Sequence, residues 1–402
     1  MKNVLPLLPA EKAALDAGFQ KTFGCAPARY FSAPGRTEIS GNHTDHQRGC
    51  VLAAAVDLHT RAAVSPNGTD RIRVQSKGYP MVEVMLSDLS PVEAEKNTTA
   101  ALVRGVAARF AQLGCKVGGF DAYIESSVLP GSGLSSSAAF EVLLGMVINH
   151  LFYDGKATQP EIAQIGQYAE NVFFGKPSGL MDQMASAVGG MVHIDFADKE
   201  KPVITPLKVD FSGYALCILD SGADHADLTD EYAAIPTEMQ SVCRCFGKEV
   251  LRDVSEEEFY VNLPALRKTC GDRAVLRCLH IFNENRRVAK QVEALEKGDF
   301  DGFLQLVRES GQSSWVYLQN VLTTGAVKNQ AVAVALALCE KYLQGLGAYR
   351  VHGGGFAGTV QAWVPLDMAE FFRENVEKTL GKGACHILSI RPQGGVEMQE
   401  NG

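Results

Sequence analysis

The sequence predicts a mixed α and β fold in two domains. Its 402 residues correspond to two domains or one large one, at roughly 100 to 200 residues per domain. Helical and strand patterns alternate along the chain, without an internal repeat or a flexible linker. The most charged interruption, DFADKEK at 195–201, falls near the middle. We therefore expect one domain over residues 1–200 and a second over residues 201–402.

Composition limits the classes of function. The chain is 46% hydrophobic and 21% charged, as in ordinary soluble proteins, and its net charge of -8 argues against a nucleic-acid or anionic-membrane partner. The longest apolar run, Ala331 to Cys339, is far below the ~20 residues of a membrane span. The N-terminal stretch contains two prolines and early charges, unlike a signal peptide. We expect a cytoplasmic, monomeric protein that acts on a small molecule.

The ten cysteines show no spacing typical of a metal site. No CxxC is present, and Cys243 and Cys245 form the only close pair. The pattern therefore predicts reduced and mostly buried thiols.

Local patterns predict the following elements. Residues Phe120 to Glu125 alternate between apolar and polar side chains, which indicates a half-buried strand leading into a glycine-rich loop. Thr158 and Glu161 form a capping box at the start of a helix over 159–174, and Asp367 and Glu370 indicate a second cap. We also expect strands within 71–86 and over 214–219 and 359–364, and helices over 286–297, 328–342 and 367–378.

The loop sequence GSGLSSS, 131–137, stands directly before an apolar helical pattern. Glycines let a backbone approach a ligand closely, and the first amides of a helix have no partner within the helix, so such a loop suits a phosphate group. GxxxxGK[ST] is absent from the chain, and GxGxxG would require a glycine at Ser136, so this loop fits neither a P-loop nor a Rossmann site. The alternative is a tight turn whose serines only cap the helix.

Three further stretches indicate a polar cleft. APGRTEISGNHTDHQRG, 33–49, collects many polar side chains without an amphipathic period. GLMDQ, 179–183, sets an acid among small and apolar residues, where a poorly solvated carboxylate needs a compensating cation or hydrogen bonds. VHGGGFAGTVQAWV, 351–364, adds a second glycine loop before a strand.

The stretches at 33–49 and 351–364, together with the glycine loop at 131–137, resemble the three signature motifs of the GHMP small-molecule kinases, and more narrowly those of the galactokinases. Gly35 and Arg36 open the first motif, 130–139 contains the second, and 353–358 the third, in the family's order along nearly the whole chain. The resemblance implies the two-domain GHMP kinase fold of the α+β class, with the active site in the cleft between the domains. It also implies ATP-dependent phosphorylation of D-galactose at the C1 hydroxyl.

The resemblance implies residues for the phosphate side of the site. Asp182 would be the general base, and Arg36 would keep it ionised and stabilise charge on the γ-phosphoryl group. Ser137 and Glu170 would hold Mg2+, which needs few protein ligands beside the phosphates; an exposed helix glutamate is the alternative for Glu170. The ATP-binding residues would be Pro130, Gly131, Ser132, Gly133, Leu134, Ser135, Ser136, Ser137 and Ala138.

On the sugar side, the resemblance implies five residues that bind substrate: Asn42, His43, Asp45, Gly179 and Tyr232. The chain departs from the family at Asn42, where most galactokinases have a glutamate that faces the sugar's O6. It departs again after Tyr232, where the usual Asn- and Arg-rich stretch reads AAIPTEM. We expect no role beyond indirect support for His46, His225 and His352.

Two alternatives follow from these departures. An asparagine no longer repels a carboxylate at C6, so the runner-up substrate is galacturonate, with Arg48 near enough to compensate its charge. On that basis, Asn42→Glu would keep galactose turnover and abolish galacturonate turnover. The second alternative is a sensor that binds ATP and galactose without catalysis, but such relatives lose residues of the second motif, which is complete here.

Overall fold

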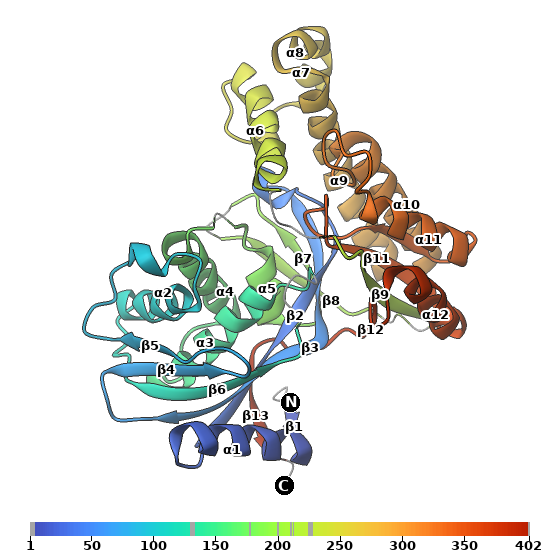
Figure 1. The fold of residues 1–402 in the computed structure, drawn as a ribbon. Coiled ribbons are helices and arrows are strands. Elements are labelled where there is room, and N and C mark those ends of the chain that lie inside the picture. The colour runs from blue at the N-terminus through green and yellow to red at the C-terminus, as the bar shows by residue number, and fades with distance from the viewer. Residues whose placement is uncertain are drawn as a thin grey trace.

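The computed structural model describes residues 5–128, 133–176, 178–198, 201–209, 211, 213–223 and 228–400. Within these ranges the chain forms two β-sheets with helices packed on them, and a group of helices that projects from one end (Figure 1). The mixed α and β class expected from the sequence is confirmed.

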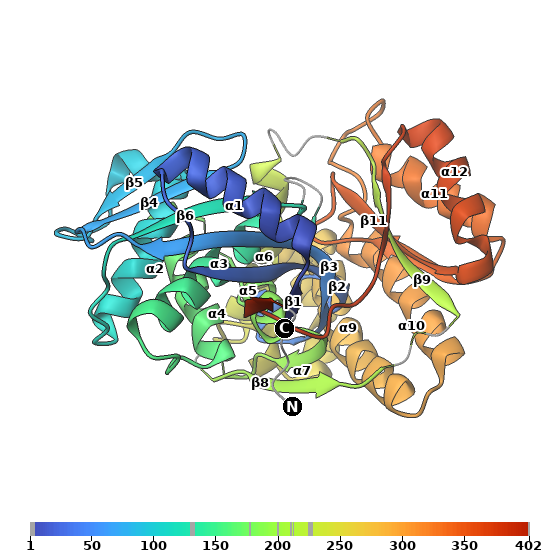
Figure 2. The same ribbon diagram turned by 90° about the horizontal axis from the view of Figure 1, so that it is seen from below.

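The larger sheet runs in the order β1-β13-β2-β3-β6-β4-β5, and β7 and β8 extend it from β3. Helix α1 lies on one face, and α2 to α5 cover the other, as Figures 1 and 2 show. The elements are β1 (Leu5–Leu7), α1 (Pro9–Phe23), β2 (Arg29–Ser40), β3 (Cys50–Pro66), β4 (Arg71–Ser76), β5 (Val82–Met85), α2 (Thr99–Gln112), β6 (Phe120–Ser126), α3 (Ser136–Phe152), α4 (Gln159–Tyr168), α5 (Met181–Val188), β7 (Met191–Asp195), β8 (Val203–Leu207) and β13 (Val396–Glu400).

The smaller sheet has the order β10-β11-β9-β12 and packs against α11 and α12. Helices α6 to α9 form the projection at the top of Figure 1. The elements are β9 (Tyr214–Asp220), α6 (Thr229–Cys245), α7 (Glu256–Val261), α8 (Leu263–Cys270), α9 (Asp272–Glu296), α10 (Phe300–Ser313), α11 (Ala331–Leu343), β10 (Ala348–Val351), β11 (Thr359–Pro365), α12 (Ala369–Leu380) and β12 (Cys385–Leu388).

Most of the elements expected from local patterns are present. Strands β4, β5, β6, β9 and β11 match, and Thr158 and Glu161 form the predicted capping box of α4. The last six residues of that predicted helix, Ala169–Phe174, are a π-helix. The predicted cap by Asp367 and Glu370 is wrong, because α12 begins at Ala369 and Met368 is its cap residue, without a side-chain hydrogen bond.

The large sheet draws on both ends of the chain. Strand β13 pairs in parallel with β1 and antiparallel with β2, and β8 joins the sheet through β7. The division at residue 200 remains a prediction. None of the helices in the described ranges is long and apolar enough to cross a membrane.

The cysteines are free thiols, and most of them are buried. Of the pair that the sequence singles out, Cys243 is buried and Cys245 is exposed. The Sγ atom of Cys245 lies 3.6 Å from that of Cys270 on α8.

A buried ion pair joins the two sheets beside the first motif. Arg350 of β10 is fully buried, and its Nη2 donates to Oε1 of Glu38 on β2 at 2.7 Å. Its Nη1 donates to the carbonyl of Ile39 at 3.0 Å. Burial raises the pKa of Glu38, although Arg350 opposes this shift. The pair therefore fixes β2 to the smaller sheet.

We predict that Arg350→Met destabilises the protein by about 3 kcal/mol, because removing one partner leaves a buried carboxyl group uncompensated. Urea unfolding, compared with Arg373→Met at an exposed pair on α12, measures this difference. The control should change the free energy of unfolding by less than about 1 kcal/mol. Equal effects of the two substitutions would contradict the prediction.

Candidate active site

The centre of the site is an ion pair between Asp182 and Arg36. Asp182 stands in the first turn of α5, and Arg36 lies on β2. Nε of Arg36 donates to Oδ1 of Asp182 at 2.6 Å, and Nη2 donates to Oδ2 at 2.8 Å. The Oγ of Ser135 donates to Oδ2 at 2.7 Å. The structure therefore brings the predicted base, its predicted cation and the phosphate loop together.

The electrostatics keep Asp182 ionised. Burial would raise the pKa of this carboxyl, but the charge and hydrogen bonds of Arg36, with the bond from Ser135, outweigh burial and lower the pKa below its ordinary value of 3.8. Asp182 is therefore a carboxylate at neutral pH and can accept a proton. Arg36 is itself buried, and its Nη1 also donates to the carbonyl of Gly133.

The described part of the second motif leads into α3. Ser135 has φ 56° and turns the chain so that the helix starts at Ser136. The first amides of α3 have no partner within the helix and suit an anion. Leu134 and Ala138 are fully buried, so their packing in the protein interior holds the loop and the start of α3 in place. Pro130, Gly131 and Ser132 lie outside the described residues, as does His225.

The two predicted metal ligands face each other. Ser137 Oγ lies 3.4 Å from Oε1 of Glu170. Glu170 is buried in the π-helix 169–174, so the sequence alternative of an exposed helix glutamate does not hold. One hydroxyl and one carboxylate oxygen at the start of α3 form a donor set that fits Mg2+, which keeps several waters and binds phosphate oxygens as well.

Sequence reasoning missed the residues that orient Glu170. Its Oε2 accepts from Oγ of Ser178 at 2.6 Å and from Nε2 of Gln183 at 2.8 Å. Gln183 also donates to Glu141, a fully buried group on α3 whose pKa is raised well above its usual range by burial and by the nearby Glu170. The only sequence signal was that Gln183 follows Asp182.

Backbone carbonyls of the third motif accept hydrogen bonds from two of the predicted sugar-binding residues. Nε2 of His43 donates to the carbonyl of Gly354 at 3.0 Å, and the hydroxyl of Tyr232 donates to that of Gly355 at 2.8 Å. Directly before the motif, His352 is buried and bonded to Thr37 and Thr359. The second glycine loop thus holds parts of β2 and α6 in place.

Burial determines the charge of two of the predicted sugar-binding residues. Burial lowers the pKa of His43 to about 4, so its imidazole is neutral at pH 7. Because Nε2 donates to Gly354, Nδ1 is left to accept a hydrogen bond. Burial raises the pKa of Tyr232 to about 12, so its phenol stays protonated.

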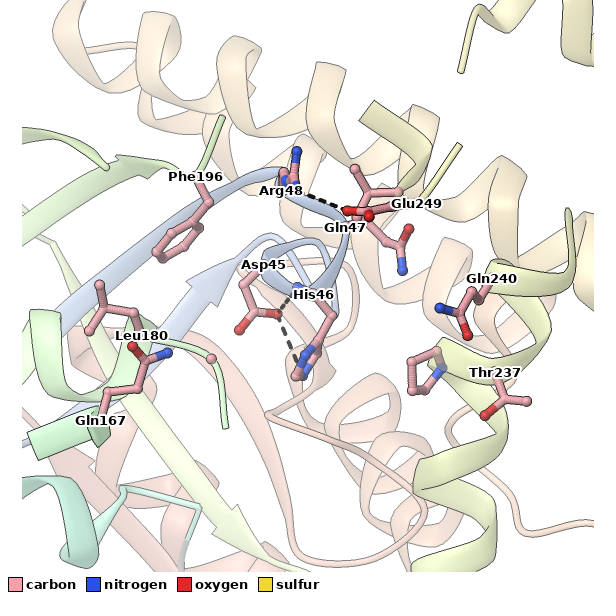
Figure 3. Close-up of a pocket in the computed structure, with 13 residues that line it drawn as sticks. Asp45, His46, Gln47, Arg48, Gln167, Leu180, Phe196, Thr237, Gln240 and Glu249 are labelled. Atoms are coloured by element: carbon pink, nitrogen blue, oxygen red, sulfur yellow. Dashed lines mark hydrogen bonds and ion pairs between the residues drawn. The ribbon is translucent and has the colours of Figure 1, made fainter. Parts of the chain in front are cut away.

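Asp45 and Gly179 lie against each other at the edge of a polar pocket. A Cβ atom at Gly179 would stand 2.0 Å from Oδ2 of Asp45, so only glycine permits this approach. Oδ1 of Asp45 accepts from the backbone amide of His46 at 2.9 Å. Figure 3 shows the pocket, of about 520 Å³, with Asp45, Arg48 and Leu180 among its lining side chains and helix α6 on its far side.

The structure places Asn42 away from this pocket. Its side chain is fully buried, and Nδ2 donates to Oε1 of Glu38 at 3.0 Å and to the carbonyl of Gly353 at 2.6 Å. Its Oδ1 accepts from Nδ2 of Asn320 at 2.8 Å. A sugar hydroxyl could reach this amide only after these bonds are broken. The predicted sugar contact therefore gains no support from the geometry.

Comparison with known proteins identifies the class of fold to which the chain belongs. The family model of the GHMP kinases N terminal domain matches residues 101–190, and the galactokinase galactose-binding signature matches 17–66. Mevalonate kinase from L. major shares the fold, with a TM-score of 0.61, 17% identity, 92% of this chain and 99% of that chain covered. The protein has the GHMP kinase fold.

The closer relatives are galactokinases. The galactokinase of Actinobacillus pleuropneumoniae is 33% identical over 379 residues, which cover 92% of this chain and 95% of the relative. The structure of Lactococcus lactis galactokinase complexed with galactose has a TM-score of 0.82 at 25% identity, with 96% of this chain and 99% of that chain covered. The chain belongs to the galactokinase family and is thereby a sugar kinase, a phosphotransferase that uses ATP.

We predict that Gly179→Ala raises the KM for the sugar at least about tenfold, because the new methyl group displaces Asp45 and a hydrogen bond to a charged group contributes about 1.5 to 3 kcal/mol. The backbone at Gly179 does not need a positive φ, so the fold should persist. Steady-state kinetics with either substrate varied checks this. The KM for ATP is the internal control and should stay within about twofold; an unchanged sugar KM would refute the prediction.

Proposed function

We propose that the protein transfers the γ-phosphoryl group of ATP to the C1 hydroxyl of D-galactose. The observation that carries the proposal is the position of Asp182. This ionised carboxylate is bonded to Ser135 of the phosphate loop on one side and to Arg36 of the sugar motif on the other. A base in that position can take the proton of a sugar hydroxyl as its oxygen attacks the phosphoryl group.

A second pocket is our proposal for the nucleotide base. It has a volume of about 450 Å³ and ends at Ser136 and Ser137, where α3 begins. Its wall includes apolar side chains that suit a flat ring. They are Tyr79, Pro80, Val82, Leu102, Ile124, Val128 and Phe140. ATP bound there would direct its phosphates along the start of α3 toward Asp182.

The groups of the chain divide the chemistry between them. Asp182 accepts the proton, while Arg36 holds the carboxylate in one orientation and adds positive charge beside the transferred group. Mg2+, held by Ser137 and Glu170, would neutralise charge on the phosphate oxygens when bound. His43 and Asp45 bind sugar hydroxyls, since one offers a neutral nitrogen and the other a carboxylate.

The choice of galactose over galacturonate rests on the neighbours of Asn42 and Arg48. The Asn42 amide is occupied by Glu38 and Gly353, so the exchange of glutamate for asparagine opens no free space for a carboxylate. Arg48 lines the pocket, but its guanidinium lies 3.4 Å from Glu249 and 3.6 Å from Asp253. These two acidic side chains partly offset its charge. We also propose that the enzyme works as a monomer in the cytoplasm, where ATP and reduced thiols occur together.

A coupled ADP-release assay with a panel of sugars, Mg2+ and ATP tests the proposed function. We expect galactose to be the best substrate by more than tenfold in kcat/KM over galacturonate, and NMR to identify the product as the 1-phosphate. A protein that ignores galactose and phosphorylates galacturonate would show that the sugar was assigned wrongly. Absence of turnover with every sugar, together with retained binding of ATP and galactose, would favour the sensor.

Asp182→Asn serves as the matched variant, because it keeps the shape of the side chain and removes its basicity. We expect turnover to fall by about 10²- to 10⁴-fold, the usual contribution of a positioned acid or base, with galactose binding still measurable by calorimetry. Turnover within about tenfold of the parent would rule out Asp182 as the base.

The buried position of Asn42 changes the expectation for Asn42→Glu. A carboxylate there would stand against both Glu38 and the carbonyl of Gly353, so we predict a loss of about 3 kcal/mol in stability rather than retained galactose turnover. The double variant Glu38→Gln with Asn42→Glu carries one buried carboxyl group, as the parent does. It should recover at least half of that loss in urea unfolding; a single variant as stable as the parent would refute this.

A further inference from the structure

Lys176 lies beside the predicted metal ligands. Its Nζ is 3.0 Å from Oε1 of Glu170, and its side chain is 58% exposed, whereas that of Glu170 is 3% exposed. Lys176 follows Gly175, which ends the π-helix with φ 88°. The side chain therefore reaches from the rim into the site along a flexible stem.

The ammonium group contacts the oxygen that the metal would need. Oε1 of Glu170 faces both Lys176 and Ser137, while Oε2 is bonded to Ser178 and Gln183. If Mg2+ binds between Ser137 and Glu170, as the proposed function requires, two cations would compete for one oxygen. Like charges at that distance repel, so binding of the metal would favour movement of the lysine away from Glu170.

The charges around Lys176 indicate where it would go. Glu170 and Asp182 together raise the pKa of Lys176, although burial lowers it, and Lys176 in turn helps to lower the pKa of Asp182. The ammonium thus lies within the electrostatic range of both the metal ligand and the base. In the proposed function, the γ-phosphoryl group lies near both of these groups during transfer. Arg36, a second cation at Asp182, uses three donors on Asp182 and Gly133.

We propose that Lys176 is a further phosphate-binding residue. In the structure the ammonium group pairs with Glu170; when nucleotide and metal bind, it moves from Glu170 to an oxygen of the γ-phosphoryl group. The side chain thereby adds a charge-assisted hydrogen bond to the triphosphate that a diphosphate cannot accept. This inference rests on the proposed nucleotide and metal positions, but not on the identity of the sugar.

Calorimetric titration without sugar tests the proposal. The probes are ADP and the non-hydrolysable ATP analogue AMPPNP, each with excess Mg2+. For Lys176→Met we expect the affinity for AMPPNP to fall about tenfold, near the lower limit for a hydrogen bond to a charged group, and that for ADP to change by less than about twofold. Lys176→Arg, which keeps the charge, should recover most of the loss.

Lys96→Met is the matched control. Lys96 approaches Gly175 from the neighbouring segment and pairs with Glu93, not with Glu170. It should leave the affinities for both nucleotides unchanged. Equal weakening of ADP and AMPPNP by Lys176→Met, or no change in either, would overturn the proposal. A parent protein that binds neither nucleotide would instead refute the proposed function itself.

Discussion

The ion pair between Arg36 and Asp182 is the contact on which the rest of the site depends. It crosses from the large sheet to the first turn of α5, and Ser135 joins it to the phosphate loop. A buried carboxylate without this cation would be protonated more easily and would lose its capacity as a base. Because Arg36 uses two nitrogens on the carboxylate, it also fixes the direction in which Asp182 can accept a proton.

A second constraint comes from the glycine loop at 353–355. Its three consecutive carbonyls accept hydrogen bonds from Asn42, His43 and Tyr232. These side chains come from both halves of the chain, and the ion pair of Arg350 with Glu38 lies next to them. The sugar side of the site is therefore held by backbone groups that substitution of side chains does not remove.

Local patterns predicted the elements that carry their own signals. The alternation in β6 and the capping box of Thr158 with Glu161 each involve residues only a few positions apart in sequence, and both features are present. The pairing of Arg36 with Asp182 followed only from the family motifs, because 146 positions separate them. Lys176 and the burial of Asn42 could not be predicted. Both depend on how the π-helix and the third motif pack, and the local hydrophobic pattern of the sequence carries no information about that packing.

A structure of the ternary complex with galactose, Mg2+ and AMPPNP would test the central claim most directly. We expect the C1 hydroxyl oxygen within hydrogen-bond distance of an Asp182 oxygen and in line with the γ-phosphorus, with the triphosphate along the start of α3. A galactose whose C1 hydroxyl points away from Asp182, or a γ-phosphorus on the far side of Glu170, would contradict the role of this carboxylate as the base.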